Sequence, residues 1–168
     1  MTASEKHPIP VTTPVGDALW LREMSGIECL GQPYRYELSL LSKDGGIKLE
    51  DLVGKTIAVE LPVLNNQTRY FHGHVASFSQ SEKRGELHQY SAVLRPWFWL
   101  LTRTSDCRIF QKMTARDIIK QVFRDRGFSD FSESLSNTYR EREINTHKIR
   151  YLQAAGRYGH YSFFTRRN

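Results

Sequence analysis

The stretch from Leu94 to Gly127 constrains the fold of this chain more than any other part of the sequence. It reads LRPWFWLLTRTSDCRIFQKMTARDIIKQVFRDRG and joins an aromatic run, a short apolar strand and an amphipathic helix. We expect the helix over about residues 114–126, because Thr114 can cap its first turn and Gly127 can end it in a left-handed conformation. Its apolar residues fall on one stripe at helical spacing: Ile118, Ile119, Val122 and Phe123.

The aromatic run itself, residues 95–101, is interpreted as a strand. On a strand, Trp97 and Trp99 would lie on one face and Phe98 on the other, so both faces are apolar. A strand of this kind is typical of a position buried on both sides, in the core or between subunits. The alternative is that the alternating aromatic rings stack on sugars or bases. A brief strand, Cys107 to Phe110, is expected to follow.

The first part of the chain has the period-two alternation of β-strands. In residues 33–40, Tyr34, Tyr36, Leu38 and Leu40 share one face. The other expected elements are a strand over 56–64, a hairpin loop at 65–67, a strand over 68–80, a polar tip at 81–86, a strand over 87–94, and a single helical turn at 49–54 closed by glycine. Strands joined by tight polar loops favour an antiparallel meander that curls into a barrel or split barrel.

These elements predict an α+β, mainly β, fold: an antiparallel, split β-barrel followed by a short strand and a capped amphipathic helix. The 168 residues suffice for one domain or for two small ones. The expected divisions are an extended lead-in at 1–17, a β-barrel domain at 18–104, a small α+β segment at 105–143, and a divergent basic tail at 144–168 that is incomplete or disordered.

Charge and composition exclude several classes of function. From residue 139 onward there are seven basic and two acidic residues, so this tail carries five of the six net positive charges. A nucleic-acid surface should spread over the folded body instead, so no nucleic-acid partner is expected. No window has the ~18 consecutive apolar residues of a membrane span, and the N-terminus lacks the apolar region of a signal peptide. We therefore expect synthesis in the cytoplasm without a cleaved signal and no stable membrane insertion. Cys29 and Cys107 are expected to be buried free thiols, the alternative being a disulfide or a reactive thiol.

Candidate sites for chemistry are few. The two histidines of His72-Gly73-His74 would point to the same face of a strand and could bind a metal ion, but no neighbouring residue completes a ligand set. The sequence has no nucleophile elbow and no glycine-rich phosphate loop. We therefore predict no catalytic residue, no cofactor and no metal, and a protein that is not an enzyme.

Several blocks of the sequence together resemble the N-terminal hub region of the VgrG family, the spike proteins of bacterial type VI secretion systems, which are similar to the tail hub proteins of contractile phages. The blocks are PYRYELSLLS, LEDLVGKTIAVEL, RYFHGHVASF, YSAVLRPWFWLLTRTSDCRIFQ and TARDIIKQVFRDRGF. The resemblance covers about residues 18–143, and it is the combination of blocks that makes it specific.

The resemblance implies a structural role. Family members form a trimeric hub of β-barrel-like domains on the end of the secretion tube, and an OB-like neck and a β-helical needle follow. It implies a homotrimer that docks on the tube protein, resides in the cytoplasm before firing and is then exported through the apparatus without a signal peptide. The alternative is a non-enzymatic β-barrel module that binds carbohydrate or peptidoglycan through Trp97 and Trp99.

The resemblance weakens after Glu143, where an acidic amphipathic helix would be expected and no further acidic residue occurs. The hypothesis drawn from this is a hub fragment that is truncated or altered in reading frame. The residues expected to form core or interface are Tyr34, Tyr36, Trp97, Phe98, Trp99, Phe110, Ile118, Ile119, Val122 and Phe123.

Overall fold

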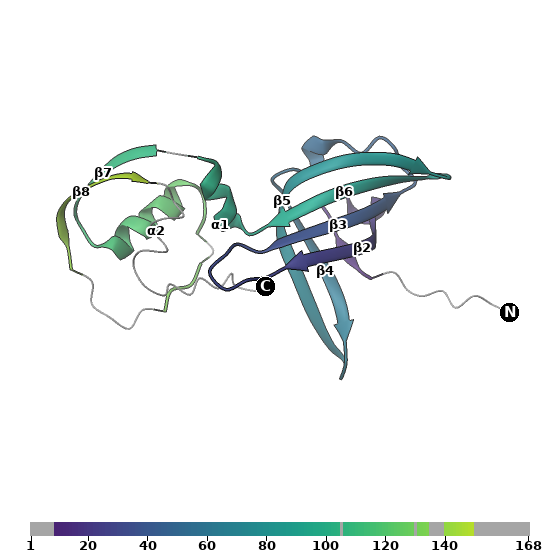
Figure 1. The fold of residues 1–168 in the computed structure, drawn as a ribbon, viewed down its shortest axis with the longest axis horizontal. Coiled ribbons are helices and arrows are strands. Elements are labelled where there is room, and N and C mark those ends of the chain that lie inside the picture. The colour runs from purple at the N-terminus through teal and green to yellow at the C-terminus, as the bar shows by residue number, and fades with distance from the viewer. Residues whose placement is uncertain (1–8, 105, 130, 135–139, 150–168) are drawn as a thin grey trace. The chain divides into compact units, whose positions relative to one another are not determined.

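The computed structural model describes residues 9–104, 106–129, 131–134 and 140–149 of the chain. The chain divides into two compact units, residues 1–97 and residues 98–168. The first is a curled antiparallel sheet, and the second contains a helix and a two-stranded sheet (Figure 1). The predicted α+β, mainly β, fold is confirmed.

Six antiparallel strands form the sheet of the first unit, in the order β1-β4-β5-β6-β3-β2. Their bounds are β1 Val11–Thr12, β2 Trp20–Ile27, β3 Arg35–Ser42, β4 Thr56–Val63, β5 Gln67–Arg84 and β6 Leu87–Arg95. The sheet curls into a half-barrel, with β1 and β2 as its edge strands. The single helical turn predicted before β4 is present at Leu49–Asp51, and Gly54 ends that joint with a φ of 81°.

Alternation along the strands explains the core. In β3, Tyr36, Leu38 and Leu40 are buried, as the sequence predicts, and β6 contributes Tyr90, Ala92 and Leu94 to the same face. Phe78 and Tyr90 stack with their ring centroids 5.3 Å apart. Burying each large apolar side chain stabilises the folded state by about 1.5–3 kcal/mol, so these inward-facing rows hold the curled sheet together.

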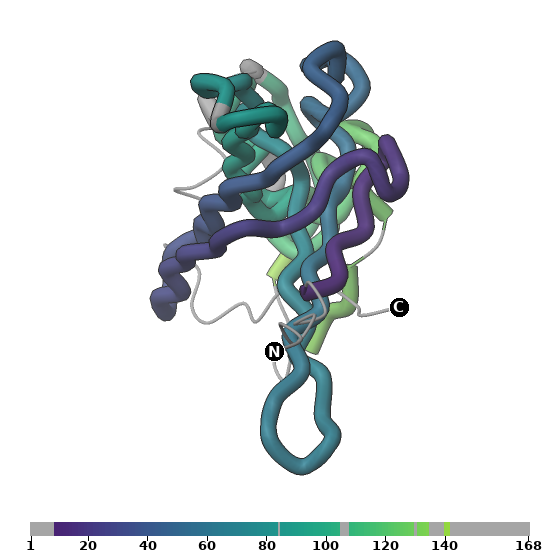
Figure 2. Tube along the Cα trace, turned by 90° about the vertical axis from the view of Figure 1, so that its right-hand side faces the viewer, coloured from purple at the N-terminus to yellow at the C-terminus, as the bar shows by residue number. Residues whose placement is uncertain are grey.

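Strands β4 and β5 form a ribbon that extends beyond its neighbours (Figures 1 and 2). Leu64, Asn65 and Asn66 connect them, and the φ angles of 65° and 54° at the two asparagines suit a tight hairpin turn. The loop predicted at 65–67 thus lies one residue earlier, because Gln67 already belongs to β5. Strand β5 is longer than predicted: it runs to Arg84, so the turn to β6 contains only Gly85 and Glu86. The charged residues expected in a loop instead form the end of a strand.

The aromatic run, where the first unit ends and the second begins in the sequence, is helical and not extended. Residues Trp97–Leu100 form the short helix α1, which continues into a 3₁₀ turn at Leu101–Arg103. The expectation of a strand here was wrong. Pro96 explains the difference, because it has no amide proton for the sheet ladder and its fixed φ suits the residue before or at a helix start. Strand β6 accordingly ends at Arg95.

The rest of the second unit follows the predicted pattern more closely. Strand β7, Asp106–Met113, pairs antiparallel with β8, Arg142–Ile149, and α2 spans Ala115–Asp125 between them. The Thr114 hydroxyl oxygen accepts a hydrogen bond from the Asp117 amide at 3.2 Å, so the predicted N-cap is confirmed. Of the tail expected at 144–168, residues up to Ile149 belong to β8, and residues 150–168 lie outside the described part of the chain.

Candidate functional site: a groove at the open side of the sheet

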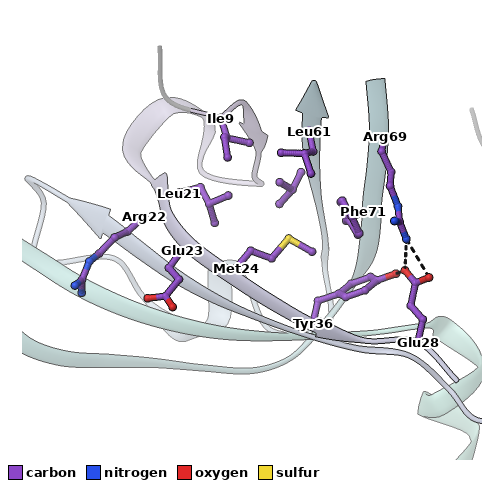
Figure 3. Close-up of a pocket in the computed structure, with 12 residues that line it drawn as sticks. Ile9, Leu21, Arg22, Glu23, Met24, Glu28, Tyr36, Leu61, Arg69 and Phe71 are labelled. Carbon is purple, nitrogen blue, oxygen red and sulfur yellow. Dashed lines mark hydrogen bonds and ion pairs between the residues drawn. The ribbon is translucent and has the colours of Figure 1, made fainter. Parts of the chain in front are cut away.

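A groove between β2 and the β4–β5 ribbon of the first unit could receive another molecule (Figure 3). Its volume is about 450 Å³, within the range of 300–1,000 Å³ that is usual for binding sites. Twelve residues line it: Ile9, Leu21, Arg22, Glu23, Met24, Gly26, Glu28, Tyr36, Val59, Leu61, Arg69 and Phe71.

Two kinds of backbone geometry direct these side chains into the groove. On the ribbon, strict alternation aims Val59 and Leu61 of β4 to the same side as Phe71 of β5. On β2, a register irregularity between Leu21 and Glu23 interrupts the alternation, so consecutive residues can line the groove. The floor is therefore apolar, although it lies at the surface.

A polar cluster closes one end of the groove (Figure 3). The Tyr36 hydroxyl donates to Glu28 Oε1 at 2.5 Å, and Arg69 Nη2 donates to both Glu28 oxygens at 3.1 Å. The Arg69 guanidinium also lies over the Phe71 ring, 4.6 Å from its centroid. Burial, together with the hydrogen bond to Glu28, raises the pKa of Tyr36 well above its usual range. The cluster links the loop after β2 to β5.

Tyr34 continues this cluster where β6 has ended. Its ring stacks on Tyr36 with centroids 4.7 Å apart, and its hydroxyl donates to the His72 carbonyl oxygen at 2.6 Å. Burial, and secondarily the charge of Glu28, raises the pKa of Tyr34 to about 12. Tyr34 through this hydrogen bond, and Tyr36 through an edge contact with the Phe71 ring at 5.4 Å, thus connect the start of β3 to β5 near the end of β6.

The His-Gly-His motif lies on β5, next to these tyrosines. His72 is exposed and His74 is half-buried, with their ring centroids 6.4 Å apart, while Gly73 faces inward and is buried. A Cβ at Gly73 would lie 3.0 Å from both the Arg95 carbonyl oxygen and the Leu94 Cβ. The motif thus reflects a close approach of backbones at the end of β6. Among the described residues, no group of three or more His, Cys, Asp or Glu side chains could hold a metal ion.

Cys29 differs from its prediction as a buried thiol, because it is a free and exposed cysteine in the loop after β2. Its neighbours explain the difference: Ile27 and Leu30 of the same hairpin are 66% and 102% exposed, so this end of β2 lies outside the core. The side chain of Cys107 lies outside the described residues.

The other residues expected in the core or an interface are distributed as follows. Tyr36, Trp97, Phe110, Val122 and Phe123 are buried, and Tyr34, Phe98, Trp99, Ile118 and Ile119 are half-buried. Phe98 and Phe131 make edge contacts with Phe123, at centroid distances of 6.1 and 5.3 Å. The Arg103 guanidinium lies over the Trp99 ring, 5.3 Å from its centroid. Whether any of them contacts another subunit stays a prediction.

The chemistry available in the groove is that of binding. Its lining residues supply two carboxylates and two guanidinium groups, and no Ser, Thr, Cys, His or Lys side chain. Glu28 and Arg69 already satisfy one another. Sequence reasoning missed the groove because its walls come from strands far apart in the chain. One signal in the sequence is the segment LPVL, residues 61–64. All four residues are apolar, whereas a strand end with one face in water should alternate apolar and polar residues.

Comparisons with known proteins agree with one another. The family model described as phage tail baseplate hub (GPD) matches residues 27–147. Two type VI secretion system spike proteins of Pseudomonas aeruginosa are similar to the chain. VgrG1b is 49% identical over 142 residues, which cover 84% of this chain and 19% of the relative. VgrG1a is 49% identical over 136 residues, which cover 80% of this chain and 21% of the relative.

A solved structure has the same fold. It is the Escherichia coli c3393 protein, described as a component of the type VI secretion system with structural similarity to the T4 bacteriophage tail proteins gp27 and gp5. The TM-score is 0.70 at 25% identity, over 91% of this chain and 40% of that one. The chain spans about a fifth of the length of the curated relatives it matches. Within the described residues, no helix has the length and apolar character needed to cross a membrane.

Proposed function

Because the chain belongs to the phage tail baseplate hub family and, within it, to the VgrG spike proteins of type VI secretion systems, we propose that it forms the hub portion of such a spike. The observation that carries the proposal is the agreement of a family match over residues 27–147 with a structural match over 91% of the chain. Neither match depends on a single motif.

The proposed role is mechanical and not enzymatic. The two relatives are named as type VI secretion system spike proteins and the family as a tail baseplate hub, and the residues that line the groove supply no nucleophile beside a base. A curled sheet held by an apolar core is suited to bearing load and to presenting surfaces to other subunits. In this role the chain contributes shape and contacts to a puncturing device.

Its proposed partners are further copies of the hub and the tube protein beneath it. We expect three copies to assemble as a closed ring, as the resemblance to VgrG hubs implies. Before firing the assembly would reside in the cytoplasm, and it would leave the cell through the secretion apparatus itself.

A chimera tests the proposal. Residues 1–149 of this chain would replace the matching segment of VgrG1a in Pseudomonas aeruginosa, and secretion of the tube protein and killing of competitor cells would be measured. Function retained above one tenth of the wild-type level supports a hub role. A matched chimera carrying Leu40→Asp, a charge placed in the fully buried core, should lose both activities. If the first chimera accumulates as folded protein and supports no secretion, the proposed role is wrong.

A glycan-binding module gains no support from the arrangement of the tryptophans. Trp97 is buried and Trp99 is covered by Arg103, and both lie on a helix and not on a flat strand surface. Stacking on sugars needs exposed ring faces, so no observation favours this second function.

A further inference from the structure

The end of the β4–β5 ribbon, residues 61–71, has strand partners only within itself in the described part of the chain. We call it the arm. Strand β1 pairs with β4 only at Ala58 and Val59, and β6 pairs with β5 only from His74 onward. Within the arm, β4 and β5 pair with one another up to the pair between Val63 and Gln67. A two-stranded ribbon is at best marginally stable alone in water, so an arm of this length needs further contacts.

The composition of the arm is that of a contact surface. Arg69 is its only charged residue, and Arg69 already binds Glu28. Three large side chains are exposed: Val63 by 41%, Leu64 by 88% and Tyr70 by 50%. Protein interfaces are depleted of charge and enriched in aromatic side chains in the same way.

The opposite end of β5 provides an internal comparison. There the hairpin tip reads SEKRGE, with four charged residues in six. Charged side chains on hairpin tips and edges are how soluble proteins prevent unwanted pairing. Strand β5 thus has a charged hairpin tip at its C-terminal end and an apolar, amide-rich tip at its N-terminal end. Only the charged tip has the composition of a surface that faces water.

The groove is the complementary surface. Its floor is apolar, and it lies beside β2, whose outer edge has no strand partner among the described residues. Arg22 and Glu23 place both signs of charge on its exposed rim. The amides of the arm's tip, Asn65, Asn66 and Gln67, can donate to a carboxylate and accept from a guanidinium.

We propose that the arm of one copy of the chain lies in the groove of a second copy, against the free edge of β2. The occupant is another copy because the arm cannot turn back into its own groove: Leu61 and Phe71 at its base already line that groove, and the paired ribbon projects away from the sheet (Figure 2). A head-to-tail contact of this kind closes as a ring when its repeated rotation returns to the first copy. The inference rests on the proposed function and assigns the surfaces through which hub copies would assemble.

The first test is Leu64→Glu in the full 168-residue chain, with Glu86→Lys on the charged tip as the matched control. Light scattering over a range of protein concentrations measures self-association. We expect Leu64→Glu to weaken association at least tenfold, and Glu86→Lys to leave it within twofold of wild type. Both positions are exposed, so circular dichroism should show an unchanged fold.

The second test locates the contact. In a chain with Cys29→Ser and Cys107→Ser, new cysteines are placed at the arm's tip and on the groove's rim by Leu64→Cys and Glu23→Cys. Oxidation should produce disulfide-linked species larger than a dimer only when both new cysteines are present, since a single cysteine can link at most two chains.

The outcomes separate the inference from the proposed function. If wild-type chains associate while Leu64→Glu has no effect, or no linked species exceeds a dimer, the inference is wrong and hub assembly uses another surface. If the wild-type chain stays monomeric at every concentration, self-assembly itself fails for this chain, and the inference fails with it.

Discussion

Gly73 offers the sharpest test of the interpretation that the His-Gly-His motif serves packing. A methyl group at this position would lie 3.0 Å from the Arg95 carbonyl oxygen and from the Leu94 Cβ, closer than ordinary van der Waals contact. Both neighbours belong to the end of β6, where Leu94 is fully buried, so neither can move freely. Gly73→Ala should therefore force β5 and β6 apart locally.

The magnitude follows from two opposing effects. Overpacking a well-packed site costs about 1–3 kcal/mol, while replacing glycine in a strand restores about 0.5–1 kcal/mol of backbone entropy. We expect a net loss of about 0.5–2 kcal/mol in the free energy of unfolding. Gly46→Ala is the matched control, because Gly46 is exposed and its added methyl group would meet only the Asp44 carboxylate, at 3.2 Å.

Urea denaturation followed by far-UV circular dichroism measures the difference. Residues 98–168 form a separate unit, so if two transitions are resolved, only that of residues 1–97 should move. A Gly73→Ala variant as stable as wild type would show that β6 yields easily at this point. The steric explanation of the motif would then be refuted, and the roles of His72 and His74 would need another reason.

Three further results are expected. Thr114→Ala should lower the stability of the second unit by about 0.5–2 kcal/mol in urea denaturation, because α2 loses its N-cap, and an unchanged midpoint would contradict that role. The hydrogen bond from Thr114 lowers the pKa of Asp117, and the Arg116 side chain lowers the pKa of Glu133. The stabilisation that these two carboxylates give the folded state should be complete above the ordinary carboxyl pKa of about 4 and should be lost as the pH falls below it. A helical circular dichroism signal that is lost already near neutral pH would contradict this direction. Tyr34 should ionise at about pH 12 in an ultraviolet pH-jump titration. The stabilisation that its protonated hydroxyl gives the folded state should be present below pH 10 and lost as the pH rises. In Tyr34→Phe, the tyrosinate absorbance that develops near pH 12 should be smaller.

The regular parts of the fold could be predicted from the sequence because each depends on its own residues. Alternation places Tyr36, Leu38 and Leu40 in the core, and Thr114 marks the start of α2 without reference to the rest of the chain. The prediction of a strand at residues 95–101 was wrong because the alternation of side chains was assumed to continue through Pro96. Proline has no amide proton for the sheet, so the strand ends before it. The loss of a backbone hydrogen-bond donor at proline outweighed the preference of aromatic residues for strands.

The groove could not be predicted in the same way. It exists because β2 and the β4–β5 ribbon come close without pairing, and no local pattern records which strands meet. The exposure of Cys29 has the same origin, since its surroundings depend on where the hairpin of β2 and β3 ends relative to the core. The Glu28–Arg69 pair joins residues 41 positions apart, a separation that single-sequence reasoning cannot assign.

The strand order has a consequence for how the chain folds. Strand β3 pairs with β6, and the whole β4–β5 ribbon lies between them in the sequence. The β3–β6 hydrogen bonds at Tyr36 therefore cannot form until the chain has been made as far as Leu94. Pairings of this range are slow, because the chain between them must be ordered first. During synthesis the hairpin of β2 and β3 would emerge with the β3 edge open, and that edge would stay open until Arg95 has left the ribosome. Between the emergence of the β2–β3 hairpin and that of Arg95, a chaperone or a neighbouring nascent chain could bind the unpaired amide and carbonyl groups of β3.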